Sequence, residues 1–476
     1  MAAKISRRKS LQSMGAIGAA SFFVYPDADI NAATSVATNS DIRKTISERV
    51  FATPFIDTHE HLIEEKGRLT GNKHPRVPAD DWSMLFSHYI DSDLRSAGMS
   101  KKEYDHFFSP DVDPIDKWKI LQPYWPFVKH TGYGLASHLS VQQLYDVPEL
   151  SGDTIRKVQE GYENLRKPGF YKKILRDMAN IESCQVNSLE DTPFMESAMP
   201  AFLMQDLSIV NMFGWMDIEK MARPTGISVT NIDDWTAVMD WWFDRYGPYA
   251  TAVKSQHAYS RDIDYTRVPE EQARPLFQKQ LDRSDMTAEE TKDLQDFLFW
   301  IAVEKSNQYN LPVKLHTGYY AGFGNMPLAR LRHNGGSATQ LCLDSPETRF
   351  VFMHINYPNY EELIAAAKNH ANCYVDMCWS WVINPIAAKD FLKKYLLTAP
   401  ANKIFTFGGD YIPVEPVLGH AIIARRGLTL AFAELVEEGW LTMDEALDLV
   451  EPIMYGNARR IFDLERKEKI LANKMW

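Results

Sequence analysis

The feature that most constrains the fold is a series of short apolar runs separated by helical stretches. The first run ends in PFIDTHEHL at residues 54–62, and the later ones are IESCQVN, AFLMQDLSIVNM, ATAVKSQHAYS, LPVKLHTGYY, RFVFMHINYP, NCYVDMCWSW and KIFTFGGDY. Patterns typical of helices, such as EETKDLQDFLFWIAVEKSNQYN and NYEELIAAAKNHA, lie between most of them. Alternating strands and helices indicate parallel strands joined by crossover helices. We therefore predict an α/β fold, a (β/α)8 TIM-like barrel.

The segment from about residue 62 to 170 departs from this alternation. DDWSMLFSHYI, KKEYDHFFS and PIDKWKILQPYWPFV are typical of helices, and prolines separate them. We predict a large helical insertion after the first strand of one domain that spans residues 41–476. A chain of 476 residues is too long for an ordinary compact domain but suits a barrel with insertions. RVPEEQARPLFQKQLDRSDMTAEE, at 267–290, is predicted to be an inserted loop.

Residues 1–40 differ from the rest of the chain. A basic start is followed by a weakly apolar, Gly/Ala-rich run that is too short to span a bilayer. Ser6-Arg7-Arg8 resembles a twin-arginine export signal, although Ser10 stands where such signals usually carry Phe. We predict an export signal with a flexible leader, and hence a periplasmic or otherwise exported protein. The alternative is a disordered N-terminus on a cytoplasmic protein.

Charge and cysteine content narrow the classes of partner. A net charge of −11 and a pI near 5.7 argue against binding to nucleic acid or to an anionic membrane. We expect a small-molecule substrate and no membrane association after signal removal, and we leave homo-oligomer formation open. The four cysteines form no CxxC pair, and we predict that they are free and mostly buried.

Two histidines stand one residue apart where the first strand ends. On an extended backbone, residues i and i+2 point to the same side, so His59 and His61 face one way, about 7 Å apart along the chain. In a barrel of this kind the functional site lies at the carboxyl ends of the strands. Such a pair can converge on one metal ion.

Further ionisable residues follow later apolar runs: Lys254, His316, His354 and Asp410. Taken singly, each histidine could be a hydrogen-bonded loop residue, Asp410 a turn residue and Lys254 a solvated edge residue. Together they form the mixture of imidazoles and carboxylate that divalent metals prefer. The sequence therefore predicts a divalent metal site, with Zn favoured and Mn, Fe or Ni as alternatives.

This arrangement resembles the amidohydrolase superfamily of metal-dependent hydrolases. The similarity is closest over residues 300–465, in LPVKLHTGYYAGFGN, FVFMHINYPNYEEL, KIFTFGGDYIPVEP and MYGNARRIF. These motifs resemble the amidohydrolase-2 branch, the amidohydrolase domain fused to glutamine synthetase-like proteins, and the uronate isomerases. The resemblance implies the metal ligands His59, His61, His316, His354 and Asp410, with Lys254 as a carboxylated bridging lysine. With that lysine two ions are expected. Without it, one ion is expected on His59, His61, His316 and Asp410, and His354 is left to act on the substrate.

The implied reaction is attack by a metal-activated water on an amide, ester or lactone bond of a small carboxylate-bearing substrate. Asp410 would move the proton, and His354 or the metal would polarise the carbonyl. Candidate substrate-binding residues are Arg261, Tyr259 and Tyr319, whereas Arg425 and Arg426 are predicted to be surface charges. The alternatives are a sugar-acid isomerase, a non-oxidative decarboxylase, and a binding or scaffold protein with a vestigial site.

Overall fold

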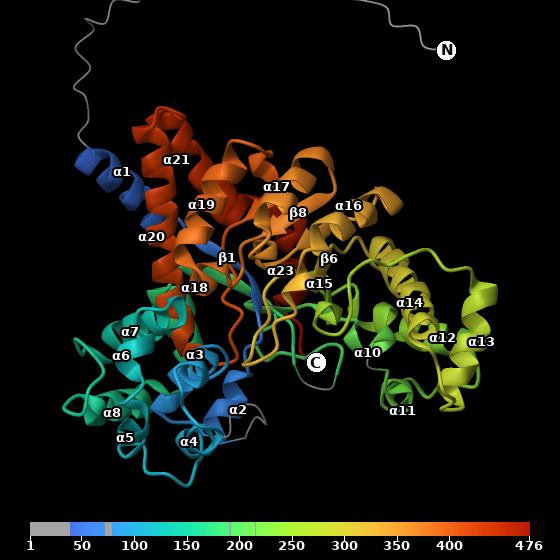
Figure 1. Ribbon diagram of the computed structural model, residues 1–476, viewed down its shortest axis with the longest axis horizontal. Helices are drawn as coiled ribbons and strands as arrows, with labels where there is room; N and C mark the ends of the chain where they lie inside the picture. Colours follow the sequence, from blue (N-terminus) through green and yellow to red (C-terminus); the bar gives the residue numbers. More distant parts are fainter. Residues whose placement is uncertain (1–38, 72–78, 190–191, 215) are drawn as a thin grey trace, which may run out of the picture. The chain divides into compact units, whose positions relative to one another are not determined.

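The computed structural model describes residues 39–71, 79–189, 192–214 and 216–476 (Figure 1). Residues Met1–Thr38 and Asn39–Trp476 are separate units, and the second unit contains all of the described residues. The predicted export signal therefore lies outside the described residues. Among the residues that are described, no helix is both long and apolar enough to cross a membrane.

Parallel strands form the centre of the unit. They are ordered β1-β2-β3 in one sheet and β4 to β9 in chain order in the other. Their bounds are β1 Phe55–Glu60, β2 Ile181–Val186, β3 Leu203–Gln205, β4 Leu207–Ser208, β5 Val253–Ser255, β6 Val313–Leu315, β7 Phe350–Phe352, β8 Cys373–Asp376 and β9 Ile404–Phe405. Only Asp206 separates β3 from β4, so one continuous run of chain joins the two sheets.

The last strand region returns to the first. Thr58 N donates to the carbonyl of Phe407 at 3.1 Å, and Asp410 N donates to the carbonyl of His59 at 2.8 Å. These bonds place the residues that follow β9 beside β1. The arrangement is an α/β TIM-barrel-like fold in which the carboxyl ends of all strands meet at one edge.

Helix α1 (Asn39–Ala52) precedes β1, and helices occupy most intervals between strands. Between β1 and β2 lie α2 Glu65–Leu69, α3 Ile90–Ser96, α4 Lys101–Phe107, α5 Lys117–Leu121, α6 Trp125–Val128, α7 Gly132–Tyr145, α8 Ile155–Leu165 and α9 Phe170–Lys172. The crossovers from β4 to β7 contain α10 Val210–Phe213, α11 Ile218–Ala222, α12 Ile232–Tyr246, α13 Glu270–Leu281, α14 Ala288–Gln308, α15 Leu328–Leu331 and α16 Asn334–Asp344. The remaining helices are α17 Tyr360–Asn369, α18 Ser380–Ile383, α19 Pro385–Leu396, α20 Glu415–Glu437, α21 Met443–Glu451, α22 Asn457–Ile461 and α23 Leu464–Leu471.

The helices α2 to α9 occupy the segment predicted as an insertion. Figure 1 shows α2 to α8, in blue to green, as one group of short helices next to β1. Helix α7 packs against α20 and α18, which anchors this group to the barrel. The close approach of α7 to α20 depends on Gly419, where an added Cβ would lie 1.9 Å from the Ala136 carbonyl oxygen.

Two expectations were wrong. The segment at 267–290 is not simply a loop, because it contains α13, whose residues Ala273, Leu276 and Phe277 are buried at helical spacing. Arg425 is not a surface charge. It is buried on α20, and its guanidinium donates to the carbonyls of Val50, Thr53, Ala179 and Asn180. The prediction for the cysteines is confirmed, since all four are free and buried.

Candidate metal centre

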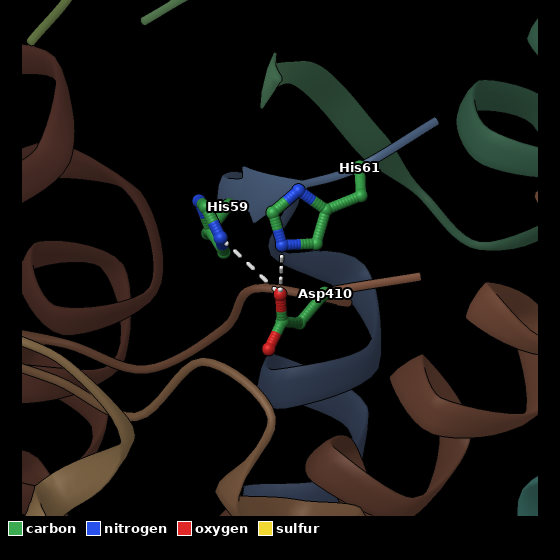
Figure 2. A group of neighbouring side chains, drawn as sticks. All are labelled: His59, His61 and Asp410. Carbon is green, nitrogen blue, oxygen red and sulfur yellow. Dashed lines mark ion pairs between the residues drawn. The ribbon is translucent and has the colours of Figure 1, made fainter. Parts of the chain in front are cut away.

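Three predicted ligands converge at the junction of β1 with the chain after β9. The Asp410 Oδ1 atom lies 3.2 Å from His59 Nε2 and 3.1 Å from His61 Nε2 (Figure 2). One ligand atom from each of the three side chains lies within 4.8 Å of the others, and all three residues are buried. The nitrogen and oxygen atoms of this group suit a divalent cation such as Zn²⁺.

A hydrogen bond to the backbone orients one of the two imidazoles. The His61 Nδ1 atom donates to the carbonyl oxygen of Asn187 at 2.6 Å, which holds the ring with Nε2 directed at Asp410. Burial lowers the pKa of His59 well below its ordinary value, so its imidazole is neutral. Burial acts to raise the pKa of Asp410, but His59 and His61 hold that pKa well below the usual range. A cation between these atoms would be stabilised, so the residues present fit a metal.

A second pair of imidazoles lies nearby. His316 Nδ1 is 3.0 Å from His354 Nε2. The other nitrogens of both rings face carbonyl oxygens, His316 Nε2 at 2.8 Å from Tyr319 and His354 Nδ1 at 3.1 Å from Cys378. Burial lowers the pKa of His316 well below its ordinary value and that of His354 to about 4. Both rings are therefore neutral, and each directs a lone pair on its facing nitrogen toward the other ring. A cation between these two nitrogens would be stabilised.

Lys254 lies inside the barrel rather than on a solvated edge. Its side chain is fully buried, and Nζ has one long hydrogen bond of 3.4 Å to the carbonyl of Ser255. Burial lowers the pKa of Lys254 to about 8. A substantial share of this amine is neutral near pH 8, which is the form that reacts with carbon dioxide. The lowered pKa is compatible with the carboxylated lysine that the resemblance implies.

The chain adopts left-handed backbone conformations where it leaves the last three strands. The φ angles are 59° at His354, 64° at Trp379 and 64° at Asp410. Such angles are unfavourable for residues with a Cβ and are concentrated at functional sites. The buried Trp379 ring lies 5.2 Å from the His354 ring and 4.6 Å from the Tyr89 ring, and its Nε1 atom has no hydrogen-bond partner among the described residues.

A buried polar layer around Lys314 lies inside the barrel next to the centre. The sequence analysis did not predict it. Lys314 Nζ donates to the carbonyl of Thr58 at 2.7 Å, to Gln185 Oε1 at 2.6 Å and to Asp206 Oδ2 at 2.8 Å. Lys314 lies on β6, two residues before His316, which follows the strand. This spacing, which puts both side chains on one face, could have predicted an inward-facing lysine.

The three predicted substrate-binding residues have different surroundings. The guanidinium of Arg261 binds the buried carboxylate of Asp296 at 2.5 Å. The ring of Tyr259 lies 4.5 Å from that of His316, and its hydroxyl accepts a hydrogen bond from Ala321 N. Tyr319 contributes its carbonyl to His316. Tyr259 and Tyr319 thus contact the centre, whereas Arg261 engages a neighbouring ion pair.

A cavity of about 940 Å³ is lined by His88 and Gln256, which both lie next to His61. One wall comes from the helical segment after β1, including His88, Asp91 and Tyr104. The facing wall comes from loops at the carboxyl ends of the strands, including Gln256 and Tyr259. The cavity has the size of a small-molecule site.

The amino-acid sequence is similar to an amidohydrolase family model and to two named proteins. The amidohydrolase family model matches residues 276–464, a range that contains His316, His354 and Asp410. The resemblance to the amidohydrolases is confirmed. A uronate isomerase from Thermotoga maritima is 22% identical over 441 residues, which cover 86% of this chain and 94% of that protein. The protein fluG from Emericella nidulans is 25% identical over 185 residues, which cover 37% of this chain and 21% of that protein.

A solved structure supports the architecture. The crystal structure of glucuronate isomerase from Caulobacter crescentus has a TM-score of 0.72 and 16% sequence identity. The match covers 91% of this chain and 95% of that chain, so it extends well beyond the segment that the amidohydrolase family model matches. At this level of identity the likeness shows the α/β TIM-barrel-like fold and not the reaction.

Proposed function

We propose that this protein is a metal-dependent isomerase that interconverts aldose and ketose forms of a small α-hydroxycarbonyl compound. The observation that carries the proposal is the convergence of His59, His61 and Asp410 on one point inside an amidohydrolase-type barrel. The choice of isomerisation is supported by relatives named uronate isomerases, which match almost their whole length, including the helices after β1.

His59, His61 and Asp410 would hold a divalent ion. When bound, such an ion acts as a Lewis acid that polarises the substrate carbonyl. Asp410 is ionised at neutral pH, and its Oδ2 atom is turned away from the two imidazole nitrogens that contact Oδ1. Asp410 can therefore accept a proton from the substrate. His354 Nδ1 lies 4.0 Å from Oδ2, so the His316 and His354 pair adjoins the carboxylate that would move the proton.

The test combines metal content with an assay of the reaction. Wild-type protein is incubated with Zn²⁺ or Mn²⁺, its metal content is measured by plasma mass spectrometry, and conversion of D-glucuronate to its ketose is followed by NMR. We expect one or two equivalents of metal. The His59→Ala/His61→Ala variant should lose both metal and activity, and the control His106→Ala, at an exposed position on α4, should keep both. Wild-type protein that stays free of metal would refute the proposal.

The metal stoichiometry also tests Lys254. Two equivalents that fall to one in the Lys254→Met variant would support a bridging carboxylated lysine. One equivalent in both proteins would show that Lys254 is not a ligand.

Hydrolysis is the second candidate, because the family model that matches residues 276–464 is that of an amidohydrolase. In that case Asp410 would accept a proton from water rather than from the substrate carbon. Metal-loaded protein that opens D-glucono-1,5-lactone but does not interconvert aldose and ketose would favour hydrolysis. Release of CO₂ from a carboxylate substrate would point to a decarboxylase instead.

We also propose that residues 1–40 direct export by the twin-arginine route, on the strength of the Arg7-Arg8 pair and the mild apolar run after it. Fusing this segment to a folded reporter in a bacterial host should place the reporter in the periplasm. The Arg7→Lys/Arg8→Lys fusion should leave the reporter in the cytoplasm. If both fusions placed the same share of reporter in the periplasm, the proposal would be refuted.

A further inference from the structure

Side chains along the strands enter the barrel in two polar layers. Gln185 on β2 points inward, because it shares the Lys314 ammonium with Thr58 and Asp206 from other strands. Residues i and i+2 of an extended chain lie on one face. Asn187 therefore points inward one layer closer to the mouth of the barrel, at the level of the metal ligands. By the same alternation Gln256 follows the inward-facing Lys254.

Asn187 is fixed beside His61 through its backbone. Its N–H donates to the carbonyl of Glu60 at 2.8 Å, and its carbonyl oxygen accepts the His61 Nδ1 proton at 2.6 Å. The side chain is fully buried, yet neither its Oδ1 nor its Nδ2 atom has a partner among the described residues. A buried carboxamide without partners is rare in folded proteins and calls for a ligand.

Gln256 supplies a second carboxamide, which lies next to the other ring nitrogen of His61. Its Nε2 atom lies 3.4 Å from His61 Nε2, and its side chain lines the cavity of about 940 Å³. Because a metal would need the lone pair of His61 Nε2, binding of the metal would leave the Gln256 amide for another acceptor. The backbone carbonyl of Asn187 and the side chain of Gln256 thus contact the two ring nitrogens of His61, and Gln256 also lines the cavity.

We propose that the carboxamides of Asn187 and Gln256 form a subsite for hydroxyl groups of the substrate, next to the carbonyl that reacts. A carboxamide offers a donor and an acceptor together, which matches a hydroxyl group. The subsite would take one uncharged hydroxyl beside the reacting carbon. This inference rests on the proposed metal-dependent function.

Two hydroxamates that differ by one hydroxyl test the subsite. Glycolohydroxamate carries a hydroxyl beside its metal-chelating group, and acetohydroxamate carries a hydrogen there. Both are titrated calorimetrically into Zn²⁺-loaded protein. We expect wild type to bind glycolohydroxamate about tenfold more tightly, the effect of one good hydrogen-bonded group. Asn187→Leu and Gln256→Met should each reduce this preference to about twofold or less, without changing the affinity for acetohydroxamate. The control Gln278→Leu, on the exposed face of α13, should keep the full preference.

Each contrary outcome has its own meaning. Equal binding of the two hydroxamates to wild type, or a preference that survives in both variants, would overturn the subsite and leave the metal centre in place. If neither compound bound to wild-type protein, the metal function would fail and the subsite with it. A purely structural role for Asn187 or Gln256 would weaken both hydroxamates alike, which would also overturn the proposal.

Discussion

Replacing Lys314 with methionine tests whether the polar layer under the metal centre is required for stability. The Lys314 ammonium and the Asp206 carboxylate are both fully buried and lie 2.8 Å apart. Lys314→Met removes the charge partner of Asp206 and also the hydrogen bonds to Gln185 and to the Thr58 carbonyl. The remaining hydrogen bond to Asp206 comes from Thr251 Oγ1 at 2.9 Å.

The expected cost follows from the charge left behind. Breaking a buried ion pair by removing one partner destabilises a protein by about 3–5 kcal/mol, because the other charge stays in a medium of low polarity. Gln185 Oε1 and the Thr58 carbonyl also lose their hydrogen-bond donor, so we expect a loss of stability at the upper end of that range. Neutralising Asp206 as well removes the uncompensated charge, so Lys314→Met/Asp206→Asn should recover about 2 kcal/mol relative to the sum of the single changes.

Equilibrium urea unfolding of metal-free protein measures these free energies without a contribution from bound metal. Lys119→Met is the control, because Lys119 forms an exposed pair with Asp116 and its loss should leave the free energy of unfolding close to that of wild type. A loss below about 1 kcal/mol for Lys314→Met, equal to that of the control, would refute the reasoning.

Three further predictions concern other parts of the chain. Arg425→Met should lower the free energy of unfolding by about 3 kcal/mol in urea, because four buried carbonyls lose their donor; an unchanged midpoint would contradict this. Burial lowers the pKa of His420 to about 3, against about 6.5 in the unfolded chain, so the unfolded state takes up the proton first and stability falls as pH drops from about 6.5 towards 3. His420→Gln should reduce that slope by up to about 1.4 kcal/mol per pH unit, and equal slopes would count against it. Zn²⁺ at a hundredfold excess over its dissociation constant should stabilise wild type by about 2.7 kcal/mol in calorimetry. The His61→Ala variant should show no such gain, and an equal gain would place the ion elsewhere.

The sequence by itself determined the alternation of strands and helices and the positions of the candidate metal ligands. Both are local properties, because the period of an apolar run identifies a strand and the residue that follows the strand lies at its carboxyl end. His59, His61 and Asp410 could be named for that reason, and the structure brings these three together. The motifs in the later part of the chain also showed the resemblance to the amidohydrolases.

Only the tertiary structure decided which partners the polar side chains choose. Arg261 binds Asp296, Arg425 caps carbonyls near β1, and Asn187 orients His61, although these pairs are far apart in sequence. Burial then set the protonation states, such as the lowered pKa of Lys254. A residue type and its neighbours in sequence give its capacity for charge and hydrogen bonding. The surrounding chain determines its solvation and partners, and these fix its role in the site.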